Sequence, residues 1–183
     1  MRRLPASVLD RLGLAAALTG VALLAAVVAG CSSDEGGGTT DRRVEIYGLV
    51  LDWLLEREEF PTVAGTPTDD VPTLFVDHLN RDIDLDVQVE LLARFEDRYD
   101  LRFVDALTEA VDEAAPRSPV REGAILLGLG SIPDTSPFVV RAEVYRDQRD
   151  LEAYRFDLVR WGGDWVLRTE PEPVEPEGFV PGE

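Results

Sequence analysis

Two segments of the chain carry apolar residues at helical spacing, and each is predicted to form an amphipathic helix. The first covers residues 41–59 and the second covers residues 87–99. The apolar face of the first helix consists of Val44, Tyr47, Leu51, Leu54 and Leu55. That of the second consists of Leu91, Leu92, Phe95 and Tyr99. Phe60-Pro61 ends the first helix, since proline cannot donate the next backbone hydrogen bond.

Shorter apolar runs predict strands, mostly in the second half of the chain. Residues 72–79 predict one strand, whereas residues 101–104 fit either a strand or the start of a third helix over FVDALTEAVDEA. Further strands are predicted at 123–132, 138–145, 151–161 and 165–169. The turn WGGDW between the last two predicts a tight hairpin, because glycine readily adopts the positive φ that such turns need.

This order of elements predicts an α+β domain over residues 41–170. Strands joined by short turns form an antiparallel β-meander, and two N-terminal helices can cover its apolar face. Residues 171–183, PEPVEPEGFVPGE, are rich in proline and glutamate and predict an acidic, disordered tail.

The N-terminus has the layout of a signal peptide. Basic residues at Arg2, Arg3 and Arg11 precede an uncharged apolar run over residues 12–30. That run is also long enough for a retained transmembrane helix, so its length alone leaves both readings open. Arg2-Arg3 likewise leaves open whether export uses the general secretory or the twin-arginine route.

The residues that end this run distinguish a cleaved signal peptide from a retained transmembrane helix. Val28-Ala29-Gly30-Cys31 resembles the lipobox of bacterial prolipoproteins. The resemblance implies that residues 1–30 are removed and that Cys31 carries a diacylglycerol, whose two acyl chains hold the protein on the membrane. Cys31 is the single cysteine of the chain and has no disulfide partner. Residues 31–40 are then predicted to be a lipidated, flexible tether.

The closing segment YRFDLVRWGGDWVL, residues 154–167, resembles a group of uncharacterised secreted bacterial α+β domains, many of them lipoproteins. It is also similar to cone-shaped domains of the nuclear transport factor 2 type. That resemblance implies a curled sheet with room for a pocket, in a fold that hosts both binding and catalysis.

The charge of the chain limits its partners. There are 36 acidic residues against 18 basic ones, giving a net charge of −18. Such a surface repels nucleic acid and anionic lipid head groups, so neither is expected to bind the folded domain directly.

Candidate catalytic and metal-binding residues are few. His78 follows Asp77, but neighbours on a strand point to opposite faces, so this pair is not predicted to act as a base with its orienting carboxylate. With one histidine and one cysteine, a metal site built from these residues is excluded. No catalytic residue and no cofactor is predicted.

Calcium is the one metal worth considering. Asp82, Asp84 and Asp86 alternate like the first ligands of an EF-hand, but Val87 and Ala93 stand where its glycine and its last acid belong. The three aspartates are weak candidates for an irregular calcium site. The alternative is a solvated loop whose last aspartate caps the second helix.

Several aromatic residues are predicted to lie mostly in the core: Trp53, Trp161, Trp165, Tyr145, Tyr154 and Phe156. In a cone-shaped sheet some of them would line a pocket. Arg141, Arg155 or Arg160 could then anchor an anionic ligand there.

The expected function is that of a lipid-anchored protein on the extracytoplasmic face of the cell membrane. Its domain is predicted to be a non-enzymatic module that binds an envelope protein or a small ligand. Two alternatives stay open: a carboxylate-based hydrolase or isomerase with a cone-shaped pocket, and a calcium-stabilised structural module.

Overall fold

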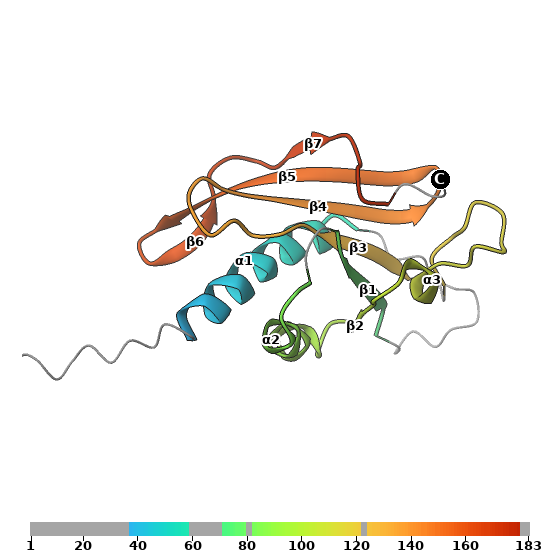
Figure 1. The fold of residues 1–183 in the computed structure, drawn as a ribbon, viewed down its shortest axis with the longest axis horizontal. Helices are drawn as coiled ribbons and strands as arrows, with labels where there is room; N and C mark the ends of the chain where they lie inside the picture. The colour runs from blue at the N-terminus through green and yellow to red at the C-terminus, as the bar shows by residue number, and fades with distance from the viewer. Residues whose placement is uncertain (1–36, 59–70, 80–81, 122–123, 180–183) are drawn as a thin grey trace, which may run out of the picture. The chain divides into compact units, whose positions relative to one another are not determined.

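The computed structural model describes residues 37–58, 71–79, 82–121 and 124–179 (Figure 1). The predicted signal peptide, Cys31 and the first part of the predicted tether lie outside these residues. Among the described helices, none has the length and hydrophobicity needed to cross a bilayer.

The described residues form an α+β fold, as predicted. The helices are α1 (Gly37–Leu55), α2 (Leu85–Phe95) and α3 (Leu107–Ala110). The strands are β1 (Thr73–His78), β2 (Asp100–Phe103), β3 (Ile125–Leu129), β4 (Phe138–Asp147), β5 (Asp150–Trp161), β6 (Asp164–Leu167) and β7 (Glu172–Val174). The ambiguous segment contains both a strand, β2, and the short helix α3. Helix α1 begins at Gly37, four residues before its predicted start.

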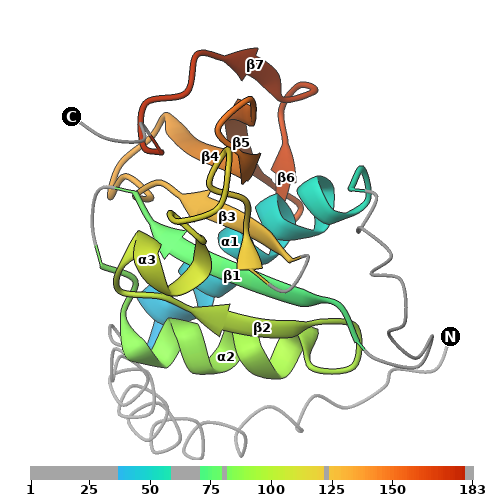
Figure 2. The ribbon, with the colours of Figure 1, turned by 90° about the vertical axis from the view of Figure 1, so that its right-hand side faces the viewer.

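All the strands of the described residues belong to one sheet, which curls into a half-barrel (Figures 1 and 2). The strand order is β2-β1-β3-β4-β5-β6, and β7 pairs with β5. The meander of β4, β5 and β6 is antiparallel, as predicted, but β1 pairs in parallel with both β2 and β3. The predicted antiparallel meander is therefore one part of a mixed sheet. Helix α2 connects β1 to β2, and a helical crossover of this kind returns the chain in the same direction.

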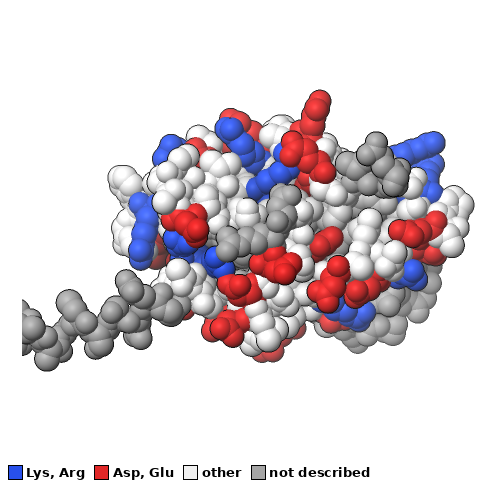
Figure 3. Space-filling view, viewed as in Figure 1, with Lys and Arg blue, Asp and Glu red and all other residues white. Residues whose placement is uncertain are grey.

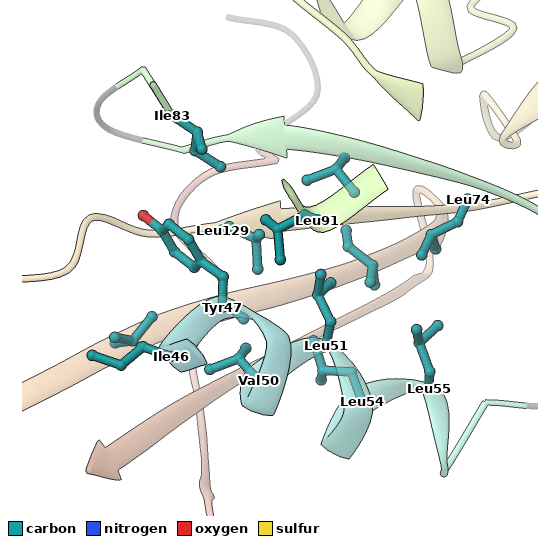
Figure 4. Close-up of a cluster of buried hydrophobic side chains, with 14 of the residues drawn as sticks. Ile46, Tyr47, Val50, Leu51, Leu54, Leu55, Leu74, Ile83, Leu91 and Leu129 are labelled. Atoms are coloured by element: carbon teal, nitrogen blue, oxygen red, sulfur yellow. The ribbon is translucent and has the colours of Figure 1, made fainter. Parts of the chain in front are cut away.

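Helix α1 lies inside the curl of the sheet and fills it with apolar side chains (Figure 4). Ile46, Val50, Leu51 and Leu54 are fully or almost fully buried against the inner face. At the end of the helix, the Trp53 ring packs edge-on against Tyr154 and Phe156 of β5, with ring centroids 5.0 and 5.2 Å away.

Helix α2 packs beside α1 and against β2. The two helices run in the same direction, because Arg43 pairs with Asp84 near their starts and Arg94 and Arg98 both reach Asp52 further along, each at 2.7 Å. The buried face of α2 consists of Val87, Leu91 and Phe95.

The outer face of the sheet carries a second apolar cluster that includes the C-terminal segment. Phe179 is 2% exposed and packs edge-on against Tyr145, with ring centroids 5.8 Å apart. Strand β7 pairs with residues 153–155 of β5. The structure thus differs from the predicted disordered tail over residues 171–179. Composition suggested an unfolded segment, but the sheet offers it a strand edge and an apolar pocket.

Candidate functional site

The acidic loop between β1 and α2 does not gather its three aspartates around one point. Asp82 Oδ1 lies 3.2 Å from His78 Nε2, whereas Asp84 pairs with Arg43 of α1. Asp86 lies in the first turn of α2. Within the described residues, no group of three or more His, Cys, Asp or Glu side chains is placed to hold a metal ion. Asp82 and Asp84 therefore contact different partners.

Asp77 and His78 do not form an ion pair, consistent with their opposite directions on β1. Burial raises the pKa of Asp77, and the charge of Asp105 adds to this rise. The backbone hydrogen bond from His78 and the charge of His78 oppose it. A carboxyl group with a raised pKa is a common feature of catalytic sites, but it needs a cleft beside it to act on a substrate.

A small hollow lies at the carboxyl ends of the parallel strands β1 and β3, a place where α/β sheets often bind ligands. Its volume is about 10 Å³, which is room for about one water molecule. The lining residues are Arg43, Tyr47, Asp82, Ile83, Asp84, Ser131 and Ile132. The Tyr47 hydroxyl donates a hydrogen bond to the Gly130 carbonyl at 3.1 Å. This hollow is too small for an organic substrate, and Asp77 is not part of its lining.

A row of exposed apolar side chains runs along α2, beginning next to this hollow. Leu85, Val89 and Leu92 are 71%, 56% and 38% exposed. Their spacing of four and then three residues places them on one face of the helix. Leu92 was predicted to belong to the buried face, and that prediction was wrong. The helix begins at Leu85 and turns residues 87, 91 and 95 inward, which leaves the second apolar row facing outward.

Acidic residues border this row. Asp86 and Glu90 each follow a member of the row and are exposed, and Asp84 precedes it. Figure 3 shows red surface around white surface in the region where Figure 1 places α2. We call Leu85, Val89 and Leu92, with the acids Asp84, Asp86 and Glu90, the α2 surface.

Most of the predicted aromatic candidates lie in the core. Trp53, Tyr154 and Phe156 pack together, Tyr145 is buried, and Trp165 packs on Phe138 at 4.7 Å between ring centroids. Trp161 is the exception: at the tip of the β5–β6 hairpin it is 78% exposed.

The three arginines considered as anion anchors make contacts within the chain. Arg141 Nε lies 3.1 Å from Glu143 Oε1, and Arg155 pairs with Glu172 at 3.0 Å. Arg160 Nε donates a hydrogen bond to the Gly163 carbonyl at 2.9 Å. Arg141 and Arg155 lie opposite each other on β4 and β5, whereas Arg160 lies near the end of β5. Arg141 and Arg155 are each paired with a glutamate of the same chain.

Comparison with known proteins adds no family. No protein-family model, curated protein or solved structure matches this chain. The resemblances noted in the lipobox and in the closing hairpin stay predictions.

Proposed function

We propose that this protein is a lipoprotein held on the extracytoplasmic face of the membrane by Cys31, and that its domain binds a protein partner through the α2 surface. The observation that carries the binding role is the exposure of Leu85, Val89 and Leu92 along one helix face. Exposed apolar groups in a contiguous row, bordered by charged residues, are typical of protein interaction sites.

A binding surface fits the geometry better than a ligand pocket. A cone-shaped sheet could hold a ligand in its curl, but Ile46, Val50, Leu51 and Leu54 of α1 occupy that space. The hollow beside α1 holds about one water molecule. The alternative of a carboxylate enzyme is supported by the raised pKa of Asp77, yet this residue does not line the hollow.

The charges on the α2 surface define the chemistry of the partner. Asp86 follows Leu85 and Glu90 follows Val89, so these two acids form a second row beside the apolar one. The apolar row therefore has an acidic border. A partner that buries Leu85 and Val89 should carry apolar side chains flanked by lysine or arginine. Complementary charges of this kind raise the association rate and favour the correct orientation.

The anchoring role rests on Val28-Ala29-Gly30-Cys31 and is tested by intact mass spectrometry of membrane-extracted protein. The wild type should begin at Cys31 and carry a diacylglycerol mass. The Cys31→Ser variant should lack the lipid and fail to remain with the membrane. A wild type that keeps residues 1–30 and carries no lipid would refute the anchor.

The binding role is tested by photo-crosslinking in the producing cells. A photoreactive amino acid at position 89 should crosslink to one discrete partner, and the same amino acid at Val166 of β6 provides the control. Val166 is 36% exposed and lies on a different element.

The identified partner then permits a quantitative test with purified proteins. Val89→Asp should weaken binding by tenfold or more, about 1.4 kcal/mol, because it places a charge in the buried part of the interface. Val166→Asp should change the affinity by less than about twofold, as expected outside the interface. Equal effects of the two variants, or crosslinks at position 166 alone, would show that the α2 surface is not the binding site.

A further inference from the structure

The structure makes the connection between Cys31 and the folded domain short. Helix α1 begins at Gly37, so only residues 32–36 separate it from Cys31. Six residue steps span at most about 21 Å, even in a fully extended chain. With a lipid on Cys31, as the proposed function holds, the start of α1 must therefore lie close to the membrane surface.

The β5–β6 hairpin lies at the same end of the domain as the start of α1 (Figure 1). Side-chain contacts link the start of α1 to the hairpin. The Arg42 guanidinium of α1 lies 5.7 Å from the Phe138 ring centroid, and Phe138 packs against Trp165 of β6. Trp165 pairs with Arg160 in the β5–β6 ladder, next to Trp161. A membrane within reach of the tether is therefore also within reach of the hairpin tip.

Trp161 has the exposure and the support expected of a side chain that enters the membrane interface. It is 78% exposed, whereas Trp53 and Trp165 pack against other rings. Gly162 and Gly163 close the turn with φ values of 64° and 108°, and the Arg160 side chain braces it through the Gly163 carbonyl. Tryptophan prefers the head-group level of a bilayer, because its ring is apolar and its N–H is polar.

Charge distinguishes the hairpin tip from the α2 surface. The tip carries one cation and one anion, Arg160 and Asp164, and is neutral overall. In Figure 3 the end of the molecule that carries this hairpin shows white surface beside both blue and red. The α2 surface is bordered by Asp84, Asp86 and Glu90, which anionic lipids repel.

We propose that the lipidated domain lies on the membrane through the tip of the β5–β6 hairpin, with the Trp161 ring inserted among the lipid head groups. The inference rests on lipidation of Cys31. It fixes the orientation of the domain and leaves the α2 surface free for a protein partner.

The test uses the full lipidated protein in vesicles of phosphatidylcholine and phosphatidylglycerol whose acyl chains carry bromine, which quenches nearby tryptophan. Because Trp161 is one of three tryptophans, the bromine should remove about a third of the emission relative to unbrominated vesicles. Trp161→Ala should abolish the quenching, and its exposed position means that the fold is retained. Trp165→Phe is the matched control and should keep the quenching.

The outcomes separate this inference from the proposed function. If mass spectrometry shows a lipid on Cys31 but the wild type is not quenched, or Trp161→Ala is quenched as strongly as the wild type, the hairpin does not contact the membrane and the inference is overturned while the anchor stands. If Cys31 carries no lipid, both the anchor and the inference fail.

Discussion

The carboxylate of Glu143 in β4 accepts a hydrogen bond from the backbone N–H of Phe179, at 3.2 Å from Oε2. The N–H groups of Glu177 and Gly178 donate to the same carboxylate at 2.8 and 3.1 Å, and Arg141 lies beside it. The side chain of Glu143 is fully buried. A buried carboxylate needs such donors, and here the C-terminal segment supplies most of them.

Glu143→Gln should therefore loosen the C-terminal segment. The amide offers one acceptor oxygen in place of two, and its NH₂ group faces N–H donors, so we expect a loss of about 2 kcal/mol in the free energy of unfolding. Urea denaturation gives the loss, and limited proteolysis with mass spectrometry should show cleavage near residues 171–179. Glu177→Gln is the control, because that side chain is 77% exposed. Equal protease resistance of wild type and Glu143→Gln would show that the Glu143 carboxylate does not hold the C-terminal segment in place.

The pocket for Phe179 depends on the missing side chain of Gly128 in β3. A Cβ at this position would lie 2.8 Å from the Phe179 ring and 2.4 Å from Leu79 Cδ2. Gly128→Ala should therefore cost about 1–3 kcal/mol through overpacking. In a Phe179→Ala background, which removes one of the two obstructing groups, the same substitution should cost less. A double-mutant cycle of urea denaturation measures this coupling, and strictly additive losses would show that Phe179 does not limit the space.

The C-terminal segment also shows where sequence reasoning reaches its limit. The alternation in residues 138–161 and the glycines of the hairpin predicted β4, β5 and β6, because those signals are local. The binding of residues 171–179 depends on Glu143 and Gly128, which are distant in sequence, and a composition rich in proline and glutamate gives no sign of either. The parallel pairing of β1 with β2 and β3 is likewise non-local and was missed.

The α2 surface lies between these cases. A sequence signal existed, since Leu85, Val89 and Leu92 have helical spacing, but Leu91 and Phe95 offered a second face with the same period. Which row turns inward is decided by packing against α1 and β2. The exposed site could therefore be assigned only from the structure.

Asp77 should lower the stability of the protein at neutral pH. Its folded-state pKa is raised, chiefly by burial, so the protonated form is favoured and ionisation carries a cost. The stability that this group contributes is present below the usual pKa of 3.8 and is lost as the pH rises through the raised value. Asp77→Asn keeps an acceptor oxygen for the His78 N–H but cannot ionise.

We therefore expect Asp77→Asn to raise the melting temperature at about pH 7 and to leave it nearly unchanged at about pH 3, where both side chains are neutral. Calorimetry across this range measures the difference. Asp86→Asn, at an exposed position on α2, provides the control for the loss of one negative charge. If the melting temperature of Asp77→Asn at neutral pH is equal to or below that of the wild type, burial of the ionised Asp77 carboxylate does not lower the stability of the protein.

Asp52 should hold the two helices together in a salt-dependent way. It receives Arg94 and Arg98 from α2, and Gly48 leaves space for the Arg94 guanidinium, which would lie 2.5 Å from a Cβ at that position. Asp52→Asn should cost about 1 kcal/mol at low salt, since the pairs are partly exposed, and less at high salt because of screening. Urea denaturation at two salt concentrations measures this, with Glu45→Gln as the control on the same helix. If the loss in unfolding free energy is the same at both salt concentrations, Asp52 stabilises the protein through packing and not through its ion pairs.

Tyr154 should give the stability a distinct dependence on alkaline pH. Its hydroxyl donates a hydrogen bond to Glu152 Oε2 at 2.6 Å, and this bond, together with burial, raises the pKa of Tyr154 from 10.0 to about 12. The folded protein keeps this proton while the unfolded chain loses it, so the contribution of Tyr154 is complete below pH 10 and is lost as the pH approaches 12.

Tyr154→Phe removes the ionisable hydroxyl group. The difference in unfolding free energy between wild type and Tyr154→Phe should be constant up to about pH 10 and shrink above it. In Tyr154→Phe, absorbance at 295 nm should show one tyrosine fewer among those that ionise at high pH. A constant difference across this range would mean that the hydrogen bond to Glu152 does not control the ionisation of Tyr154.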